Sequence, residues 1–377
     1  MRPSVAIIGT RGYPSYYGGF ETAVRRLAPW LVDQGWDVTV YGRSGATVDD
    51  DSVRDPRVKS VFTPGLESRT LSTLSYGLTA SLHAAFVSRP DVVLVMNVAN
   101  GYFLPLLRLL GVPSLVNVDG IEWERSKWGS LAKAMFKVGA FLTARSAHEL
   151  VFDARAIEAR WAAEFGRTGV FIPYGGDEVG ALPTEDGLDR RGYALMVARF
   201  VPENTVGEFL DAAEEIAAKR PVIIVGSSGY GGALEEKVGA LAARNANVRW
   251  LGHVSDDRRL FGLLQNTGAY FHGHSVGGTN PALVQAMAVA APTVARDTVY
   301  NREVLGSDGT FTAADPSSIA HAVIAMLEDP DSQERSSANS LARSRAHYTW
   351  DGVCRSYEQS LSRLLPLSRA RRRRNRA

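Results

Sequence analysis

The sequence is poor in the features that mark secreted and membrane-spanning proteins. It contains one cysteine, Cys354, among 377 residues, so no disulfide can form within the chain and a reducing compartment is expected. The apolar stretch that ends at Gly9 is too short for a signal peptide and is predicted to form a buried strand. The apolar segment 103–112 contains Arg108 and is well below the roughly 20 residues that a membrane span requires. These absences predict a cytoplasmic protein.

Net charge is also low. Lys and Arg number 42 against 40 Asp and Glu, which leaves a net charge of +2. Six of the last nine residues are arginines (369, 371–374 and 376), and removing these six charges from +2 leaves −4 for the rest of the chain. Because that body is acidic, we expect no nucleic-acid partner. The segment 367–377 fits two interpretations that stay open here: a disordered, solvated tail, or an electrostatic tether to an anionic membrane surface.

What the sequence does contain is a regular alternation of strand-like and helix-like segments. A chain of 377 residues with 45% apolar and 22% charged residues is expected to form two globular domains. Short apolar runs alternate with segments of helical period, which is typical of doubly wound parallel sheets. The predicted strands are 5–9, 38–41, 58–62, 92–96, 114–118, 149–152 and 170–172 in the first half, and 194–197, 222–225, 248–251, 269–271 and 293–295 in the second.

This alternation stops in the polar segment 177–192, where we expect the linker. We therefore predict an N-terminal Rossmann-like domain over 1–178 and a C-terminal Rossmann-like domain over 193–348. A helix over 349–366 is expected to return to the first domain, ahead of the arginine-rich tail. In this α/β architecture ligands bind at the carboxyl ends of the strands, and the two domains would face one another across a cleft.

Two glycine-rich segments lie where a predicted strand ends and a helix begins, Gly9–Thr22 and His272–Met287. In the first, Gly18 and Gly19 open the helix and Glu21 lies in its first turn. Bare N–H groups and the helix dipole favour an anion at such a place, and a tight turn is the alternative. The segment lacks the third glycine of a dinucleotide-binding fingerprint, which argues against an NAD-binding domain. Two such loops facing one another would hold a diphosphate, as an enzyme that uses a nucleotide-sugar requires.

Four segments together resemble a known enzyme family. GTRGYPSYYGGFET (9–22), NVDGIEWERSKW (117–128), VARFVPEN (197–204) and HGHSVGGTNPALVQAMA (272–288) look like family 4 glycosyltransferases of the GT-B fold. More narrowly, they are similar to the subgroup that contains bacterial rhamnosyltransferases of capsule and cell-wall polysaccharide synthesis. The likeness covers nearly the whole chain up to about residue 365.

The resemblance implies an activity. A sugar would be transferred, with retention of configuration, from a nucleotide-sugar held mainly by the C-terminal domain to an acceptor on the N-terminal domain. The implied donor is a nucleotide-activated deoxysugar such as dTDP-rhamnose. The implied acceptor is an oligosaccharide or a lipid-linked saccharide at the inner face of the cell membrane. The enzyme would then be cytoplasmic and peripheral to the membrane, which the basic tail would help it reach.

Arg199 follows a predicted strand and is placed to neutralise the charge that develops on a departing nucleoside diphosphate. An exposed surface arginine is the alternative interpretation. Members of the family often carry a lysine a few residues later, where this chain has Asn204. One charge-assisted hydrogen bond contributes about 1.5–3 kcal/mol, so further cations are expected. The candidates for these auxiliary contacts to phosphate or acceptor are Arg11, Arg125 and Lys127, together with Glu21.

The second glycine-rich loop and the helix after it are expected to hold the rest of the donor. The residues assigned to donor binding there, beside Gly18, Gly19, Arg199 and Asn204, are His274, Gly277, Gly278, Thr279, Asn280 and Gln285. Related enzymes commonly have two glutamates in this region, one toward the donor sugar and one on the ribose hydroxyls, and the matching positions here are Gly277 and Gln285. Glutamine accepts a hydrogen bond without charge, so weaker nucleotide binding or an altered donor is expected.

Asp119 ends a predicted strand on the crevice side, where a carboxylate can orient or deprotonate an acceptor hydroxyl. Glu122 or Glu124 is the second choice for this catalytic role. Many relatives have a histidine at the place of Asp119, and a turn-forming aspartate before Gly120 is the alternative interpretation.

No metal ion or other cofactor is expected. His272 and His274 have no third ligand with them, and Asp49–Asp51 lies in a polar segment that we expect to be solvated. Two other functions stay open. A nucleotide-sugar epimerase of the same fold would need an acid/base pair beside the sugar and no acceptor. A noncatalytic protein that binds a nucleotide-sugar or a polysaccharide is suggested by Asn204 and Gln285.

Overall fold

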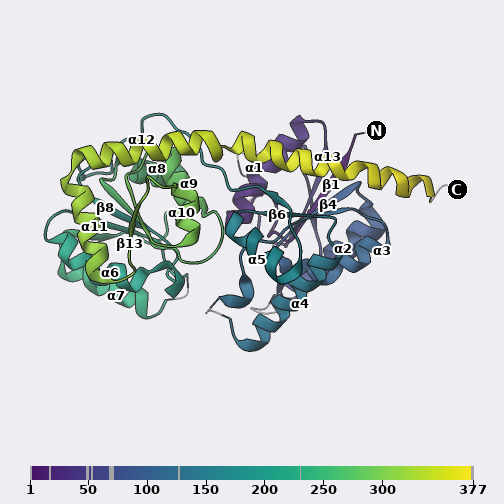
Figure 1. Cartoon of the computed structure of the whole chain (residues 1–377), viewed down its shortest axis with the longest axis horizontal. Coiled ribbons are helices and arrows are strands. Elements are labelled where there is room, and N and C mark those ends of the chain that lie inside the picture. Colours follow the sequence, from purple (N-terminus) through teal and green to yellow (C-terminus); the bar gives the residue numbers. More distant parts are fainter. Residues whose placement is uncertain are drawn as a thin grey trace. The chain divides into compact units, whose positions relative to one another are not determined.

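The computed structural model describes residues 2–16, 18–47, 51, 54–67, 72–125, 128–229 and 231–374. The chain folds into two compact units, which Figure 1 shows coloured along the sequence. Unit 1 contains Met1–Pro173 together with Asp351–Ala377, and unit 2 contains Tyr174–Trp350. The last part of the chain therefore groups with the N-terminal unit, which is the side to which the sequence predicts that the final helix returns. That the two sheets face one another stays a prediction.

Unit 1 is built on a parallel 7-stranded sheet with the order β3-β2-β1-β4-β5-β6-β7. Its strands are β1 (Ser4–Ile8), β2 (Asp37–Gly42), β3 (Lys59–Phe62), β4 (Val92–Met96), β5 (Ser114–Asn117), β6 (Glu149–Phe152) and β7 (Val170–Phe171). Its helices are α1 (Gly19–Asp33), α2 (Ser72–His83), η1 (Ala84–Ser88), η2 (Val98–Phe103), α3 (Leu104–Leu109), η3 (Glu122–Glu124), α4 (Ser130–Ser146), α5 (Arg155–Phe165) and α13 (Trp350–Arg374).

Unit 2 is built on a parallel 6-stranded sheet with the order β10-β9-β8-β11-β12-β13. Its strands are β8 (Ala194–Val197), β9 (Val222–Val225), β10 (Val248–Trp250), β11 (Ala269–His272), β12 (Thr293–Arg296) and β13 (Thr310–Thr312). Its helices are η4 (Pro202–Asn204), α6 (Val206–Ala217), α7 (Ala233–Arg244), α8 (Asp257–Asn266), α9 (Pro281–Ala288), α10 (Val299–Leu305), α11 (Pro316–Glu328) and α12 (Pro330–His347).

The strands are apolar on both faces because helices cover both faces of each sheet. In unit 1, every residue of β4 is buried. In unit 2, alternate residues of one strand join different cores, since Met196 packs with the helix α6 cluster and Leu195 packs with the α9 cluster on the other face. This arrangement confirms the predicted α/β class with two parallel sheets.

All of the predicted strands are present, and their bounds agree within one residue. Sequence reasoning missed β13, a short edge strand whose two threonines and single phenylalanine give no apolar run. The helix expected over 349–366 is longer than predicted. α13 continues to Arg374, so the backbone is helical in residues where the sequence analysis expects a disordered tail. Among the described residues, no helix combines the length and the apolar character needed to cross a membrane.

Candidate active site

The spatial order of the strands places both glycine-rich loops at equivalent points. In each sheet the order reverses direction beside the first strand, between β1 and β4 in unit 1 and between β8 and β11 in unit 2. Ligands of open α/β sheets bind at the carboxyl edge beside such a reversal. The first glycine-rich loop follows β1, and the second follows β11. Each loop therefore lies where its sheet is built to bind a ligand.

The first loop is shaped by close backbone contact and by an internal carboxylate. Gly9 has a φ of +98°, and a Cβ atom there would lie 2.2 Å from the carbonyl oxygen of Met96, so this position requires glycine. Helix α1 begins at Gly19 after the extended Gly18, as the sequence predicts, and no described side chain caps it. Glu21 is buried, and its Oε1 accepts a hydrogen bond from the N–H of Arg11 at 3.0 Å. Glu21 thus holds the loop backbone, which is a different task from the predicted contact with phosphate or acceptor.

The second loop leads into α9 through a side-chain cap. Asn280 precedes the helix, and its Oδ1 accepts a hydrogen bond from the N–H of Ala282 at 3.0 Å. The backbone of Gly277 has a φ of +99°, a conformation that favours glycine. Thr279, two residues later, is buried. His274 is tied through its carbonyl oxygen to the Asn301 side chain at 3.0 Å. The loop is therefore fixed in shape by bonds to the chain itself, with its glycine backbone at the carboxyl edge of the sheet.

The loop after β8 is bonded to the second glycine-rich loop. Arg199 is exposed, and its carbonyl oxygen accepts a hydrogen bond from Nδ2 of the buried Asn204 at 2.9 Å. The carbonyl oxygen of Glu203 accepts hydrogen bonds from the N–H of Ser275 at 2.9 Å and from its hydroxyl at 2.8 Å. Asn204 therefore braces the turn that presents Arg199, at the position where the motif resemblance implies a lysine.

A cation that sequence reasoning missed lies in the same cluster of loops. Thr205 is fully buried with a φ of +57°, an unusual conformation for a β-branched residue. Its hydroxyl donates to the carbonyl oxygen of Gly273 at 2.5 Å and accepts from Nη1 of Arg296 at 2.9 Å. Arg296 is the last residue of β12. Its position at the end of a predicted strand is the sequence signal that could have identified it as a candidate site residue. Strained residues held by their surroundings concentrate at functional sites.

Gln285 makes a pair of hydrogen bonds that only an amide can make. Its Oε1 accepts from the N–H of Asp177 and its Nε2 donates to the carbonyl oxygen of Asp177, both at 2.9 Å. A glutamate at this position would lose the donor and would bring a negative charge to a carbonyl oxygen. A glutamine at the position where the motif resemblance implies a glutamate thus has a structural explanation, since this side chain ties α9 to the start of unit 2.

The two histidines of the second loop stack on one another. The ring centroids of His272 and His274 are 4.5 Å apart, and Nδ1 of His272 lies 2.9 Å from the hydroxyl of Tyr270. Burial of His272, and secondarily the neighbouring His274, lower the pKa of His272. Among the residues that the structure describes, no three His, Cys, Asp or Glu side chains are grouped so that they could hold a metal ion. Asp49 and Asp50 lie outside the described residues.

The buried histidine predicts how stability depends on pH. Because the folded pKa of His272 is below the unfolded value of 6.5, the unfolded chain takes up the proton first, and stability falls as the pH drops below about 6.5. The contribution of one such group is at most about 1.4 kcal/mol per pH unit. We expect His272→Gln to flatten the pH dependence of the free energy of unfolding between pH 7 and 5, as measured by urea denaturation. His321→Gln, at an exposed position, is the matched control, and an unchanged slope in His272→Gln would contradict this assignment.

Asp119 is held in place by a network that reaches α13. It follows β5 with a φ of +59°, its N–H donates to Oδ1 of Asn117 at 2.9 Å, and its Oδ2 accepts from Nδ2 of Asn97 at 3.3 Å. Nδ2 of Asn117 in turn donates to the hydroxyl of Tyr357 on α13 at 2.7 Å. Asn97 also has a positive φ, of +72°. Two left-handed polar residues at the carboxyl ends of neighbouring strands indicate a functional edge.

Glu122 and Arg125 are engaged with one another. Glu122 is buried, with Oε1 2.7 Å from Nε of Arg125, and its Oε2 accepts from Nε1 of Trp128 at 2.8 Å. Both carboxylate oxygens have partners within the segment, and the charge of Arg125 is already balanced. This pairing favours a structural role for both residues over the predicted catalytic and phosphate roles. Lys127 lies outside the described residues.

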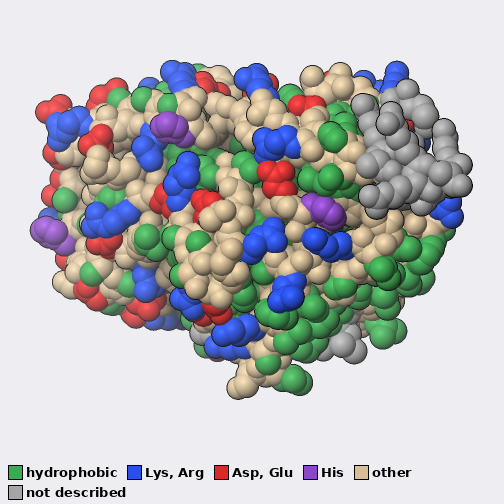
Figure 2. Space-filling view, turned by 45° about the vertical axis from the view of Figure 1, so that its right-hand side comes forward, with side chains coloured by type: hydrophobic (Ala, Val, Ile, Leu, Met, Phe, Trp, Pro, Cys, Tyr) green, Lys and Arg blue, Asp and Glu red, His purple; other side chains and the backbone are tan. Residues whose placement is uncertain are grey.

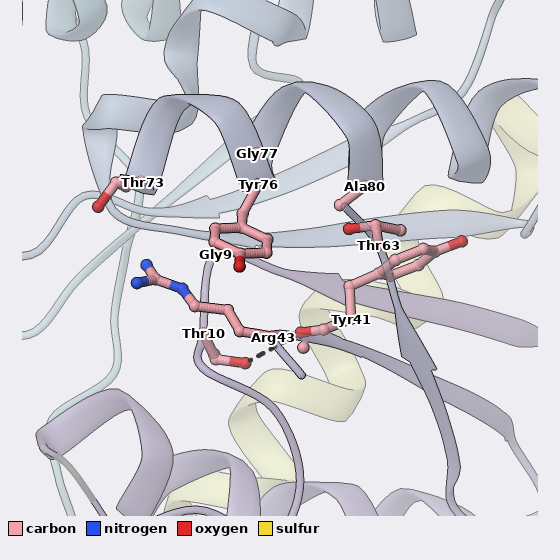
Figure 3. Close-up of a pocket in the computed structure, with 10 residues that line it drawn as sticks. Gly9, Thr10, Tyr41, Arg43, Thr63, Thr73, Tyr76, Gly77 and Ala80 are labelled. Atoms are coloured by element: carbon pink, nitrogen blue, oxygen red, sulfur yellow. Dashed lines mark hydrogen bonds between the residues drawn. The ribbon is translucent and has the colours of Figure 1, made fainter. Parts of the chain in front are cut away.

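A pocket opens at the carboxyl edge of unit 1, beside the first loop (Figure 3). It is small, with a cavity volume of about 20 Å³, and is lined by Gly9, Thr10, Tyr41, Gly42, Arg43, Thr63, Thr73, Tyr76, Gly77 and Ala80. The Arg43 guanidinium lies 4.9 Å from the centroid of the Tyr76 ring, and its Nη1 donates to Ser72 at 2.7 Å. Its buried Nε makes no hydrogen bond to any described residue. Burial, and next the nearby Arg11, lower the pKa of Arg43. Sequence reasoning missed this arginine, although it directly follows a predicted strand.

Two comparisons with known proteins agree with this geometry. Residues 191–329 match the family model "Glycosyl transferases group 1", and residues 18–175 match the "Glycosyl transferase 4-like domain". The fold is similar to that of a sucrose-phosphate synthase from Thermosynechococcus elongatus, with a TM-score of 0.78, 16% identity, and coverage of 97% of this chain and 100% of that one. It is also similar to HepE from Anabaena in complex with UDP, with a TM-score of 0.71, 15% identity, and coverage of 96% and 99%. These neighbours have the GT-B fold. No curated protein matches the chain in sequence.

Proposed function

Because the chain consists of the two domains of a GT-B glycosyltransferase, we propose that it transfers a sugar from a nucleotide-sugar bound by unit 2 to a saccharide acceptor bound by unit 1. The observation that carries the proposal is the cluster of loops at the carboxyl edge of unit 2. There the loops after β8, β11 and β12 are bonded to one another, with Arg199 and Arg296 among them. The relative HepE supports a nucleotide-sugar donor, because it has been crystallised with UDP and with UDP-glucose.

Charge neutralisation in this proposal needs no metal ion. A departing nucleoside diphosphate is stabilised by fixed donors and positive charges that are in place before the bond breaks. Arg199 would supply one positive charge and Arg296 a second, which compensates for the asparagine at position 204. Backbone N–H groups of the loop from Gly277 to Asn280 would supply neutral donors. This division of tasks is the proposed reason that the family's lysine is dispensable here.

The acceptor is proposed to bind at the carboxyl edge of unit 1. The pocket beside Gly9 is too small to enclose a sugar, but the groups around it, an aromatic ring, hydroxyls and the half-buried cation of Arg43, suit contact with an anionic group such as a phosphate on a saccharide. Asp119, at the end of β5 on the same edge of the sheet, is proposed to orient or deprotonate the acceptor hydroxyl. The finer assignments rest on the motif resemblance: a dTDP-rhamnose donor, retention of configuration, a lipid-linked acceptor of cell-surface polysaccharide synthesis, and a basic tail that binds the membrane.

A panel of nucleotides and nucleotide-sugars tests the proposed function. We expect thermal stabilisation by UDP or dTDP and by at least one of their sugar conjugates, because a ligand that binds only the folded state raises the melting temperature. Donor turnover should then depend on an added acceptor and should persist in EDTA. A chain that binds the donor without turnover would be a noncatalytic partner, and conversion of the donor sugar without any acceptor would identify an epimerase. Loss of activity in EDTA would overturn the metal-free mechanism.

A further inference from the structure

Unit 1 exposes large apolar side chains on a set of neighbouring helices. The most exposed are Leu109 on α3 at 85%, Leu131 on α4 at 78% and Val87 on η1 at 67%, and Leu82, Phe86 and Phe141 are exposed as well. Helix α4 packs against η2 and α3, and η2 packs against α2, so these elements lie side by side (Figure 1). Green side chains gather over this part of the molecule toward the lower right of Figure 2. We call this surface the α2–α4 face.

The exposed side chains follow helical spacing, so they form stripes. On α4, Leu131, Val138 and Phe141 lie seven and three residues apart, whereas Ala140 and Ala144 on the opposite side are buried. Residues at these spacings share one side of a helix. Single exposed apolar residues are ordinary on protein surfaces, but stripes on neighbouring helices of one unit indicate a surface that contacts a partner.

The charges of the same helices are all of one sign. The segments α2, η1, η2, α3 and α4 contain no Asp or Glu, although the whole chain has 40 of them. They contain Arg108, Lys133, Lys137 and Arg145, of which Lys137 pairs with Glu164 of α5 at 3.0 Å. Helices that combine exposed apolar stripes with positive charge, and contribute no carboxylate of their own, form a surface complementary to a bilayer of anionic lipids.

We propose that the α2–α4 face docks on an anionic lipid bilayer, with its apolar stripes in the headgroup region and its cations on the lipid phosphates. The inference deepens the proposed function, because it rests on an acceptor that is anchored in a membrane. Helix α2 contributes to both the pocket and the α2–α4 face. Tyr76 and Gly77 line the pocket beside Gly9, whereas Leu78 and Leu82 are exposed on the same helix. A lipid-linked acceptor could then keep its lipid chain in the bilayer while its head group contacts the residues around the pocket.

Sedimentation with vesicles tests the docking surface in the full chain. The double variant Leu131→Gln/Phe141→Gln removes two apolar contacts, and we expect it to bind vesicles of phosphatidylglycerol and phosphatidylcholine at least about tenfold more weakly than the unchanged chain. Val299→Gln is the matched control, because Val299 is also a largely exposed apolar side chain, at 59%, but lies on α10 in unit 2. Lys133→Glu should weaken binding to these vesicles while leaving the little binding to pure phosphatidylcholine unchanged.

Removal of residues 369–377 separates this face from the basic tail. If the face docks by apolar contact as well as charge, the shortened chain should keep vesicle binding at 0.5 M salt, where the Debye length is only about 4 Å and exposed charges are strongly screened. Equal sedimentation of the double variant and the unchanged chain would overturn the proposal. So would a concentration-dependent dimer that the double variant abolishes, because the face would then cover a second copy. UDP binding is measured on every variant to show that unit 2 is folded. If the unchanged chain binds vesicles but not UDP, the proposed function is wrong, whereas the evidence for the α2–α4 face stands.

Discussion

Replacing Arg199 with alanine is expected to weaken the binding of a nucleoside diphosphate by roughly 10- to 150-fold. A charge-assisted hydrogen bond is worth about 1.5–3 kcal/mol, and each 1.4 kcal/mol is a factor of ten in affinity. Calorimetric titration with UDP and with dTDP measures the effect. Arg220→Ala is the matched control, because Arg220 is an exposed arginine of the same unit that lies just before β9, at the opposite edge of the sheet.

The second proposed cation calls for a graded test, because Arg296 also bonds to Thr205. Arg296→Lys keeps the positive charge, whereas Arg296→Ala removes it together with the hydrogen bond. If the charge contributes to diphosphate binding, the lysine variant should bind the nucleotide more tightly than the alanine variant at comparable thermal stability. Unchanged affinity in Arg199→Ala and in Arg296→Ala would place the diphosphate outside this cluster of loops.

Asp119→Asn is expected to lower kcat by about 10²- to 10⁴-fold, the range for loss of a general acid or base, while the affinity for the donor stays within about twofold. Asparagine has the same shape, tolerates a positive φ, and can still accept the hydrogen bond from Asn97. The variant therefore removes the charge without disturbing the turn. Steady-state transfer kinetics, combined with donor titration, separate the two effects.

Glu124→Gln is the matched control for this experiment. Glu124 is a carboxylate of the same segment, half exposed and paired with Arg160 at 2.5 Å, so we expect its loss to leave kcat nearly unchanged. Parallel losses of turnover and donor affinity in Asp119→Asn would show that Asp119 acts through the structure of unit 1. Such a result would direct attention to the pocket around Arg43.

Local sequence patterns predicted the secondary structure well because the central strands of both sheets are short, apolar and buried on both faces. β4 is a continuous run of five buried residues, and β9 is a continuous run of four, which is the pattern of strands covered by helices on both faces. β13 escaped prediction because an edge strand needs little apolar character. The glycine of the first loop was also readable, since Gly9 meets the backbone of Met96 where no side chain fits.

The site was predicted less completely, because the sequence shows which polar residues are present and not what they contact. Glu21 and Glu122 are both carboxylates beside the motifs, yet one bonds to the loop backbone at Arg11 and the other pairs with Arg125. Arg43 and Arg296 belong to no recognisable motif, so the sequence does not distinguish them from the other arginines of the chain. Their positions at strand ends became informative only when the strand order was known.

The sequence by itself determined the α/β class, the strands other than β13, the two glycine-rich turns and the places where the helices after them begin. These features depend on residues near one another in the chain, through apolar period, backbone freedom and capping. Tertiary structure alone decided which polar groups meet: Gln285 with Asp177, Arg296 with Thr205, and Asn117 with Tyr357. Each of these pairs is separated by some ninety residues or more. Such contacts are set by the packing of whole strands and helices, for which no local pattern carries the information.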